Sequence, residues 1–166
     1  MESHFSAVQF VGREREMKLL QECSSRVRES GRGWTVFISG EAGSGKTRCM
    51  EELRTWALLD GWRVVEGDCG MRGEAAYDPY RQILTRTGLT GGKAAFRFGR
   101  QNPGGVDASS QYAAGQFRDL LTRELIRHLA ERPTMLFLHD FHLADDAACA
   151  VLDYLSSDIQ AHPIFM

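Results

Sequence analysis

The chain has 166 residues, of which 43% are hydrophobic and 25% are charged, and its formal net charge is −2 at pH 7. This length suits a single domain with a sizeable core, and the composition is that of an ordinary globular protein. The near-neutral charge gives no electrostatic reason to expect this segment to bind nucleic acid or an anionic membrane.

The N-terminal residues and the cysteines indicate the compartment. Residues 1–6 lack the basic and apolar regions of a signal peptide, and no apolar run approaches the ~20 residues needed to span a membrane. The four cysteines form no C-x-x-C pair, so free thiols in a reducing environment are the simpler interpretation. We therefore expect a cytoplasmic protein.

The first expected element is an amphipathic helix from residue 15 to about residue 29. Apolar residues recur there at spacings of three and four, namely Met17, Leu20, Cys23 and Val27. Residues 30–33, which contain two glycines, then end the helix. The segment Phe10-Val11-Gly12-Arg13-Glu14 precedes it, and its charged residues are, taken alone, an ordinary first helical turn.

Residues 40–47, Gly-Glu-Ala-Gly-Ser-Gly-Lys-Thr, match the phosphate-binding loop pattern G-x-x-x-x-G-K-[ST] at every fixed position. They lie between residues 34–39, which we predict to be a short buried strand, and residues 48–59, a predicted helix that begins near Lys46. The motif thus has the strand before it and the helix after it that its mechanism needs. We expect nucleotide contacts from Gly40, Glu41, Ala42, Gly43, Ser44, Gly45, Lys46, Thr47 and Arg48.

Each residue type in this loop has a physical role. The glycines let the backbone turn tightly and leave its amide N–H groups open to a phosphate. The helix that follows adds the positive end of its dipole. Lys46 would place a point charge near the β- and γ-phosphates, and the Thr47 hydroxyl would be a ligand for Mg²⁺. The motif therefore predicts that the chain binds the phosphates of a nucleotide.

Beyond the loop, strands and helices alternate. Residues 62–67 are predicted to form a second strand, which completes a right-handed β-α-β unit, and a short helix is predicted from Pro79 to Arg86. Residues 87–110 are rich in glycine and are predicted to form a long loop. A helix from residue 111 to the stop at Pro133 follows, with an apolar stripe made by Phe117, Leu120, Leu121, Leu125, Ile126 and Leu129.

Residues 134–138 form an unbroken apolar run, as expected for a central parallel strand, and lead into His139 and Asp140. A further helix is predicted at 147–155, and residues 163–166 open a fourth strand. Mg²⁺ prefers oxygen ligands, usually one or two carboxylates beside phosphate oxygens and waters, and ligands bind at the carboxyl ends of the strands in such sheets. We therefore assign Asp140 to Mg²⁺, with a turn-capping role as the alternative.

Three segments together resemble a known family. Residues 10–14, the loop at 40–47 and residues 138–145, Leu-His-Asp-Phe-His-Leu-Ala-Asp, resemble the AAA-type ATPase domain of the signal-transduction (STAND) class, found in large LuxR-type bacterial transcriptional regulators. The resemblance implies one P-loop ATPase domain over residues 1–166, with 1–30 as a helical lead-in and 34–166 as the nucleotide-binding core. It implies a three-layer α/β P-loop NTPase fold, a parallel sheet flanked by helices.

The resemblance also implies roles for individual residues. Gly12 and Arg13 would lie near the nucleotide, Lys46 and Thr47 would contact phosphate and Mg²⁺, and Asp140 would belong to the acidic motif. ATP and Mg²⁺ are then the expected cofactors, Lys46 and Asp140 the catalytic residues, and Thr47 and Asp140 the metal ligands. The implied activity is that of a nucleotide-dependent switch. Its partners would be downstream regulatory domains or a second copy of the chain, with no direct contact to nucleic acid or membrane.

The sequence departs from the family in two respects. Similar proteins place two acids where this chain has His139-Asp140, so either the metal-side role or the water-positioning role lacks its carboxylate, and neutral imidazole is a poor ligand for Mg²⁺. We expect nucleotide binding with slow hydrolysis or none. The chain also stops in its fourth strand, so we expect a fold without the last strand and lid, which would expose an edge of the phosphate-loop strand.

Two other functions fit the same residues. A small-molecule or nucleotide kinase shares the phosphate loop but usually begins directly with its strand, and a second substrate pocket would have to lie in the loop at 87–110. A non-catalytic remnant that binds weakly is favoured by the missing carboxylate and the missing strand. We expect ATP rather than GTP, because no N-K-x-D-like segment suggests recognition of guanine.

Overall fold

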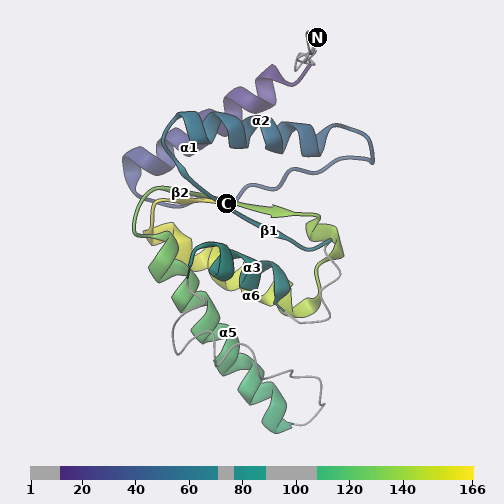
Figure 1. Ribbon diagram of the computed structural model, residues 1–166, viewed down its shortest axis with the longest axis vertical. Coiled ribbons are helices and arrows are strands. Elements are labelled where there is room, and N and C mark those ends of the chain that lie inside the picture. The colour runs from purple at the N-terminus through teal and green to yellow at the C-terminus, as the bar shows by residue number, and fades with distance from the viewer. Residues whose placement is uncertain (1–11, 71–76, 89–107) are drawn as a thin grey trace, which may run out of the picture.

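The computed structural model describes residues 12–70, 77–88 and 108–166, which form three layers (Figure 1). Helices α1 (Glu14–Ser30) and α2 (Lys46–Leu59) cover one face of a parallel β-sheet. Helices α3 (Asp78–Arg86), α5 (Ala108–Leu129) and α6 (Asp146–Asp158) cover the other face. The expected fold class, a three-layer α/β P-loop NTPase fold with a parallel sheet between helices, is confirmed.

Within the described residues, the sheet has three strands in the order β1 (Arg63–Asp68), β2 (Thr134–His139) and β3 (Ile164–Phe165), all parallel. The first four residues of β2 are buried, as expected for a central strand. Asp68 pairs in register with His139, so β1 and β2 end side by side. Short 3₁₀ turns, η2 (Phe141–Leu143) and η3 (Ile159–Ala161), flank α6.

One hydrophobic cluster fills the space between α1, α2 and the sheet. The amphipathic pattern of α1 and the apolar face of α2 both point into it, and its buried members are Leu20, Val27, Cys49, Leu53, Ala57, Trp62, Met135, Phe137 and Phe165. Gly31 ends α1 in the left-handed region, and its N–H donates to Val27 O at 2.9 Å. This packing fixes the position at which α2 begins, and therefore the loop that leads into it.

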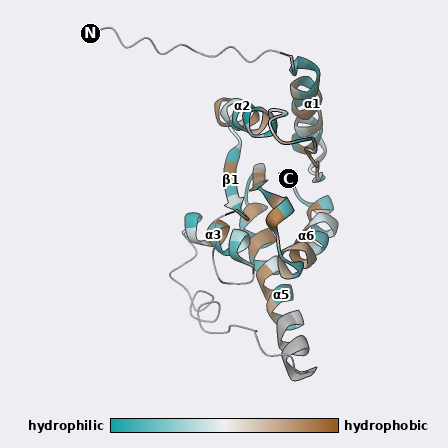
Figure 2. Ribbon diagram, turned by 90° about the vertical axis from the view of Figure 1, so that its right-hand side faces the viewer, coloured by the Kyte–Doolittle hydropathy of each residue, from teal (hydrophilic) through white to brown (hydrophobic). Residues whose placement is uncertain are grey.

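A second cluster lies between the sheet and helices α3, α5 and α6, whose apolar residues gather toward the strands (Figure 2). The fully buried Tyr80 of α3 donates its hydroxyl to Ala148 O of α6 at 2.9 Å, which ties these helices together. Burial raises the pKa of that hydroxyl far above its usual range, so it stays protonated. Among the described helices, none is long and apolar enough to cross a membrane.

The prediction of a buried strand at residues 34–39 is wrong. Within the described residues, this segment makes one isolated parallel bridge, from Trp34 to Phe165, and the Phe37 side chain is 71% exposed. The segment lies beside the two-residue strand β3. Trp34 N donates to Ile164 O at 3.1 Å and Val36 N donates to Met166 O at 2.7 Å, and among the described residues no backbone hydrogen bond joins residues 37–39 to a strand. The second half of the segment therefore has no ladder.

Two further expectations concern the region before β2. Of the predicted loop at 87–110, residues 89–107 lie outside the described residues, while 108–110 are helical, so α5 begins earlier than the expected residue 111. The prediction that Leu120 belongs to the apolar stripe of that helix is wrong, because Leu120 is 45% exposed. Leu121 and Leu125, which belong to the same predicted stripe, are fully buried. Each step of one residue along a helix rotates the side-chain direction by about 100°, so Leu120 and Leu121 face different sides.

Candidate functional site

The loop before α2 encloses the ammonium group of Lys46. Lys46 Nζ donates to Gly40 O at 2.8 Å and to Glu41 O at 2.9 Å, both within the loop itself. Ser44 N donates to Glu41 O at 3.2 Å and closes the turn. The loop therefore curls around a positive charge, at the place where the sequence motif predicts phosphate.

Two glycines give the loop this shape. Gly43 and Gly45 have φ angles of 76° and 85°, in the left-handed region that residues with a side chain rarely adopt. Between them, Ser44 Oγ is buried without a hydrogen-bond partner among the described residues. A buried hydroxyl without a partner is costly, so this atom fits a site that an acceptor such as a phosphate oxygen completes.

The start of α2 differs from the start of α6. The N-cap residue of α2 is Gly45, which has no side chain, and the first turn of α2 holds no acid. At α6, by contrast, the N-cap residue Asp145 accepts a hydrogen bond from Ala148 N at 2.7 Å, and Asp146 follows in the first turn. The start of α6 thus carries negative charge that complements its own helix dipole, and the start of α2 carries none. This arrangement suits an external anion.

The other loop residues predicted to contact nucleotide differ in their exposure. Glu41, Ala42 and Thr47 are exposed, so the Thr47 hydroxyl is open to a ligand. Arg48 points along the helix and forms an ion pair with Glu52 at 2.6 Å. That residues 40–48 contact nucleotide stays a prediction of the motif.

Gly12 and Arg13 lie next to this loop at the start of α1. Arg13 Nη2 donates a hydrogen bond to Ser44 O, across 31 residues of sequence. Gly12 N donates to Glu14 Oε1 at 3.1 Å, and backbone hydrogen bonds to the Glu14 carboxylate lower the pKa of that group. Of the two residues predicted from the family resemblance, Arg13 thus contacts the phosphate loop directly, and Gly12 precedes it in the chain.

Asp140 follows β2 at the carboxyl edge of the sheet, and the turn lies toward the same side of the molecule as the phosphate loop (Figure 1). Its φ of 49° is left-handed, a conformation that Asp tolerates better than most residues. Its carbonyl accepts from Leu143 N at 2.8 Å, and its side chain is exposed. Within the described residues, no hydrogen bond or ion pair joins Asp140 to the phosphate loop. The strained turn thus presents an open carboxylate.

His139, the last residue of β2, lies on the face of the sheet that α2 covers. Its Nε2 lies 3.3 Å from Glu66 Oε1 on the neighbouring strand, and the same oxygen lies 3.1 Å from Arg54 Nε of α2. The imidazole also stacks on Phe137, with ring centroids 6.3 Å apart. The imidazole thus links β2 to Glu66 of β1, which also pairs with Arg54 of α2.

Sequence reasoning missed Asp68, at the end of β1. Its Oδ1 accepts from Gly70 N at 2.7 Å. A Cβ placed on Gly70 would lie 3.2 Å from Asp68 Oδ1 and 3.1 Å from Asp140 Oδ2, so the two carboxylates flank this glycine. The parallel pairing of Asp68 with His139 is the signal that could have located it, because strands that end in register bring their last residues together.

Cys69 lies half-buried in the same region. Burial, followed by the negative charges of Asp68, Asp145 and Asp140, raises its pKa to about 11. Its backbone N–H donates to His139 O at 3.0 Å. The thiol is therefore neutral at physiological pH and reports on the surrounding carboxylates.

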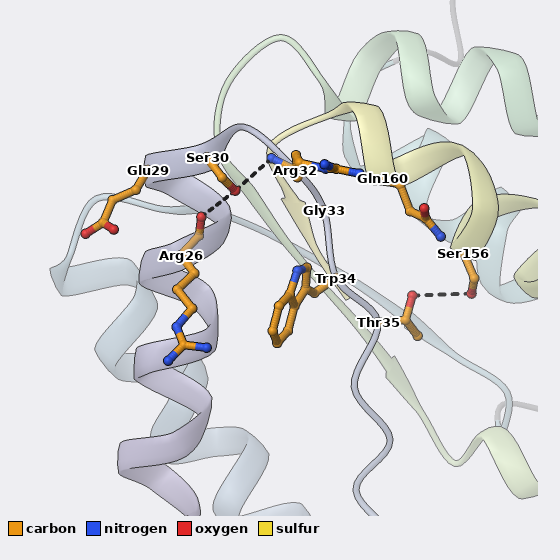
Figure 3. Close-up of a pocket in the computed structure, with 9 residues that line it drawn as sticks. All are labelled: Arg26, Glu29, Ser30, Arg32, Gly33, Trp34, Thr35, Ser156 and Gln160. Carbon is orange, nitrogen blue, oxygen red and sulfur yellow. Dashed lines mark hydrogen bonds between the residues drawn. The ribbon is translucent and has the colours of Figure 1, made fainter.

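A groove of about 830 Å³ lies at the opposite end of the segment 34–39, away from the phosphate loop (Figure 3). The end of α1 and the end of α6 form its walls, and Thr35 Oγ1 bonds Ser156 Oγ at 3.3 Å across its floor. The lining residues are Arg26, Glu29, Ser30, Arg32, Gly33, Trp34, Thr35, Ser156 and Gln160. The groove holds none of the residues predicted for nucleotide binding.

Comparison with known proteins gives one match. The sequence model of a protein family described as "AAA ATPase domain" matches residues 9–166. The matched region includes the phosphate loop, the start of α1 and the acidic turn, so it covers both parts of the site. No curated protein and no solved structure matches the chain.

Proposed function

The chain belongs to the AAA ATPase domain family, and from this membership we propose that it binds ATP with Mg²⁺ and acts as a nucleotide-dependent switch with slow hydrolysis or none. The chain is a nucleotide-binding P-loop module. The observation that carries the finer proposal is the loop at 40–47, which encloses the Lys46 ammonium group between two of its own carbonyls. We propose a regulatory, LuxR-type context for this switch, on the family resemblance alone.

Two side chains of the loop and the start of α2 would hold the phosphates. Lys46 would exchange its bonds to Gly40 O and Glu41 O for bonds to phosphate oxygens, and the uncapped start of α2 would add N–H donors. Ser44 Oγ would gain the partner that it lacks among the described residues. The bound Mg²⁺ would supply charge neutralisation at the phosphates. The exposed Thr47 hydroxyl and Asp140 carboxylate are the oxygens that fit such a hard cation.

Hydrolysis needs a carboxylate that positions the attacking water, in addition to a metal-side acid. Asp140 can take one of these roles, because its carboxylate is exposed at the carboxyl edge of the sheet. His139 cannot take the other, because its ring is held against Glu66 and Phe137. Bound ATP would therefore be hydrolysed slowly, which suits a switch better than an efficient ATPase.

The test is calorimetric titration with ATP, with and without Mg²⁺, on the wild-type chain and on Lys46→Ala. We expect saturable binding that Mg²⁺ strengthens and that Lys46→Ala weakens by about a hundredfold, roughly 2.7 kcal/mol. Lys18→Ala is the matched control, since Lys18 is 77% exposed on α1 and should leave binding unchanged. A folded wild-type chain that does not bind ATP would overturn the proposal.

A further inference from the structure

Arg13 lies against the second half of the phosphate loop. Its Nη2 donates to Ser44 O, and its Nε lies 3.7 Å from the point where a Cβ on Gly45 would stand. Arg13 also acts on Cys49 of α2, where its positive charge opposes the rise in the thiol pKa that burial causes. These three observations place the guanidinium beside the loop and the first turn of α2.

The rest of Arg13 is anchored on α1. Its backbone carbonyl accepts from Met17 N at 3.0 Å, and its Nη1 lies 3.9 Å from Glu16 Oε1 one turn along the helix. The side chain is 28% exposed, so the loop and α1 enclose most of it. Arg13 therefore links α1 to the phosphate loop.

The hydrogen bond from Arg13 to Ser44 O also orients the next amide, Gly45 N–H. Ser44 C=O and Gly45 N–H belong to one peptide unit, and in a planar trans peptide they point in opposite directions. A guanidinium that holds Ser44 O toward α1 therefore turns Gly45 N–H toward the other side of the loop. Rotation of this peptide changes the ψ angle of Ser44 and the φ angle of Gly45, and glycine adopts either sign of φ, so the Gly45 side sets little steric barrier to such a rotation.

We propose that Arg13 is a positioning residue, which acts on the phosphates by fixing the peptide between Ser44 and Gly45 and does not itself bind adenosine. The proposal rests on the proposed function and refines it. Arg13, at the start of α1, would affect binding of the triphosphate indirectly, by way of the loop. The same contact couples the loop to α1, which packs on α2 and forms one wall of the groove at Trp34.

The first test needs no nucleotide. Amide hydrogen exchange of the loop, residues 40–46, is compared in the ligand-free wild-type chain, Arg13→Ala and Arg13→Lys. We expect Arg13→Ala to speed amide exchange in the loop at least fivefold. Arg13→Lys, which keeps a charged hydrogen-bond donor group, should show a smaller change. Arg15→Ala is the matched control, because Arg15 is exposed on the same turn and should have no effect. Unchanged exchange in a folded Arg13→Ala chain overturns the proposal.

The second test separates the phosphates from the nucleoside. Binding of ATP and of inorganic tripolyphosphate is measured for the wild-type chain and for Arg13→Ala. We expect both affinities to fall by the same factor, about tenfold. A loss that affects ATP and spares tripolyphosphate would mean direct contact with adenosine and would overturn the proposal. If the wild-type chain binds neither ligand, the proposed function fails, while the exchange experiment still decides the role of Arg13.

Discussion

The two halves of the candidate site are built in opposite ways. The phosphate half, residues 40–48 with Arg13, is closed, because Lys46 and Arg13 donate to carbonyls of the loop itself. The acidic half, His139 and Asp140 with Asp68, is open, because Asp140 is exposed on a left-handed turn and His139 points back to Glu66. The first half matches its sequence motif at each fixed position, and the second departs from its motif.

Because of this difference, nucleotide binding and ATP hydrolysis should depend on different halves of the site. Phosphate binding depends on cations and backbone N–H groups, and the phosphate half carries both without help from the acidic half. Turnover needs a residue that positions the attacking water in addition to ligands for the metal, and the acidic half holds the carboxylates of Asp140 and Asp68 beside the imidazole of His139. Changes in the phosphate half should therefore affect binding strongly, while changes in the acidic half should affect the Mg²⁺ dependence and the rate.

The largest effect is expected from Gly45→Ala in the phosphate half. A Cβ at a φ of 85° costs about 1–2 kcal/mol, and the loop can relieve this strain by rotating the amide that faces phosphate. We expect ATP affinity to fall by about a hundredfold in calorimetric titration. Gly31→Ala is the control, because Gly31 has a φ of 67° at the end of α1 with open space around its Cα. It should lose similar stability and retain binding. Equal affinities in the two variants would contradict the prediction.

A smaller effect is expected from Asp140→Asn in the acidic half. Removing the carboxylate takes away one Mg²⁺ ligand, so the strengthening of ATP binding by Mg²⁺ should fall about tenfold, while binding without Mg²⁺ stays the same. Titrations with and without Mg²⁺ give both values. The control is Asp146→Asn, an exposed acid in the first turn of α6. A uniform loss under both conditions would show that Asp140 supports the fold and not the metal.

His139→Asp tests whether the missing acid limits turnover. Wild-type phosphate release should stay below the ~1–100 s⁻¹ range of efficient phosphoryl-transfer enzymes, and the variant should release phosphate several-fold faster. It should also lose about 0.5–1 kcal/mol of stability, because the new carboxylate lies near Glu66 in place of the imidazole. His139→Asn serves as the control that removes the ring without adding charge. Wild-type turnover within the range above would refute the prediction.

The sequence predicted the parts of the site that one continuous segment builds. Residues 40–47 specify their own loop through glycine and helix geometry, and the helix that begins at Lys46 follows from the same segment. The contact of Arg13 with Ser44 could not be read from the residues, because it joins positions 31 apart. Glu66 and Asp68 were missed for the same reason, since the pairing of β1 with β2 brings both of them to His139, 73 and 71 residues away in the chain.

Segment 34–39 shows the limit of local pattern in the fold. Its apolar residues favour a buried strand, yet burial and pairing depend on the neighbour that the sheet provides, and among the described residues only Trp34 and Val36 of this segment donate backbone hydrogen bonds to the β3 region. Leu120 shows a similar limit within a helix. Two adjacent leucines both fit an apolar stripe, and only the position of the sheet decides that Leu121 is the buried one.

The smallest expected effect uses Cys69 as a probe of the acidic half. A pKa of about 11 leaves roughly a hundredfold less thiolate near neutral pH than a pKa of 9 would, so iodoacetamide should modify Cys69 far more slowly than the exposed Cys149. Removing a nearby negative charge lowers the pKa and speeds the reaction. Asp140 contributes less than burial or Asp68, so Asp140→Asn should speed modification of Cys69 by less than about threefold, and Asp68→Asn by more. Mass spectrometry of the alkylated peptides measures both rates. An unchanged rate in both variants would mean that these carboxylates do not face the thiol, and the acidic half would then be more open than the structure shows.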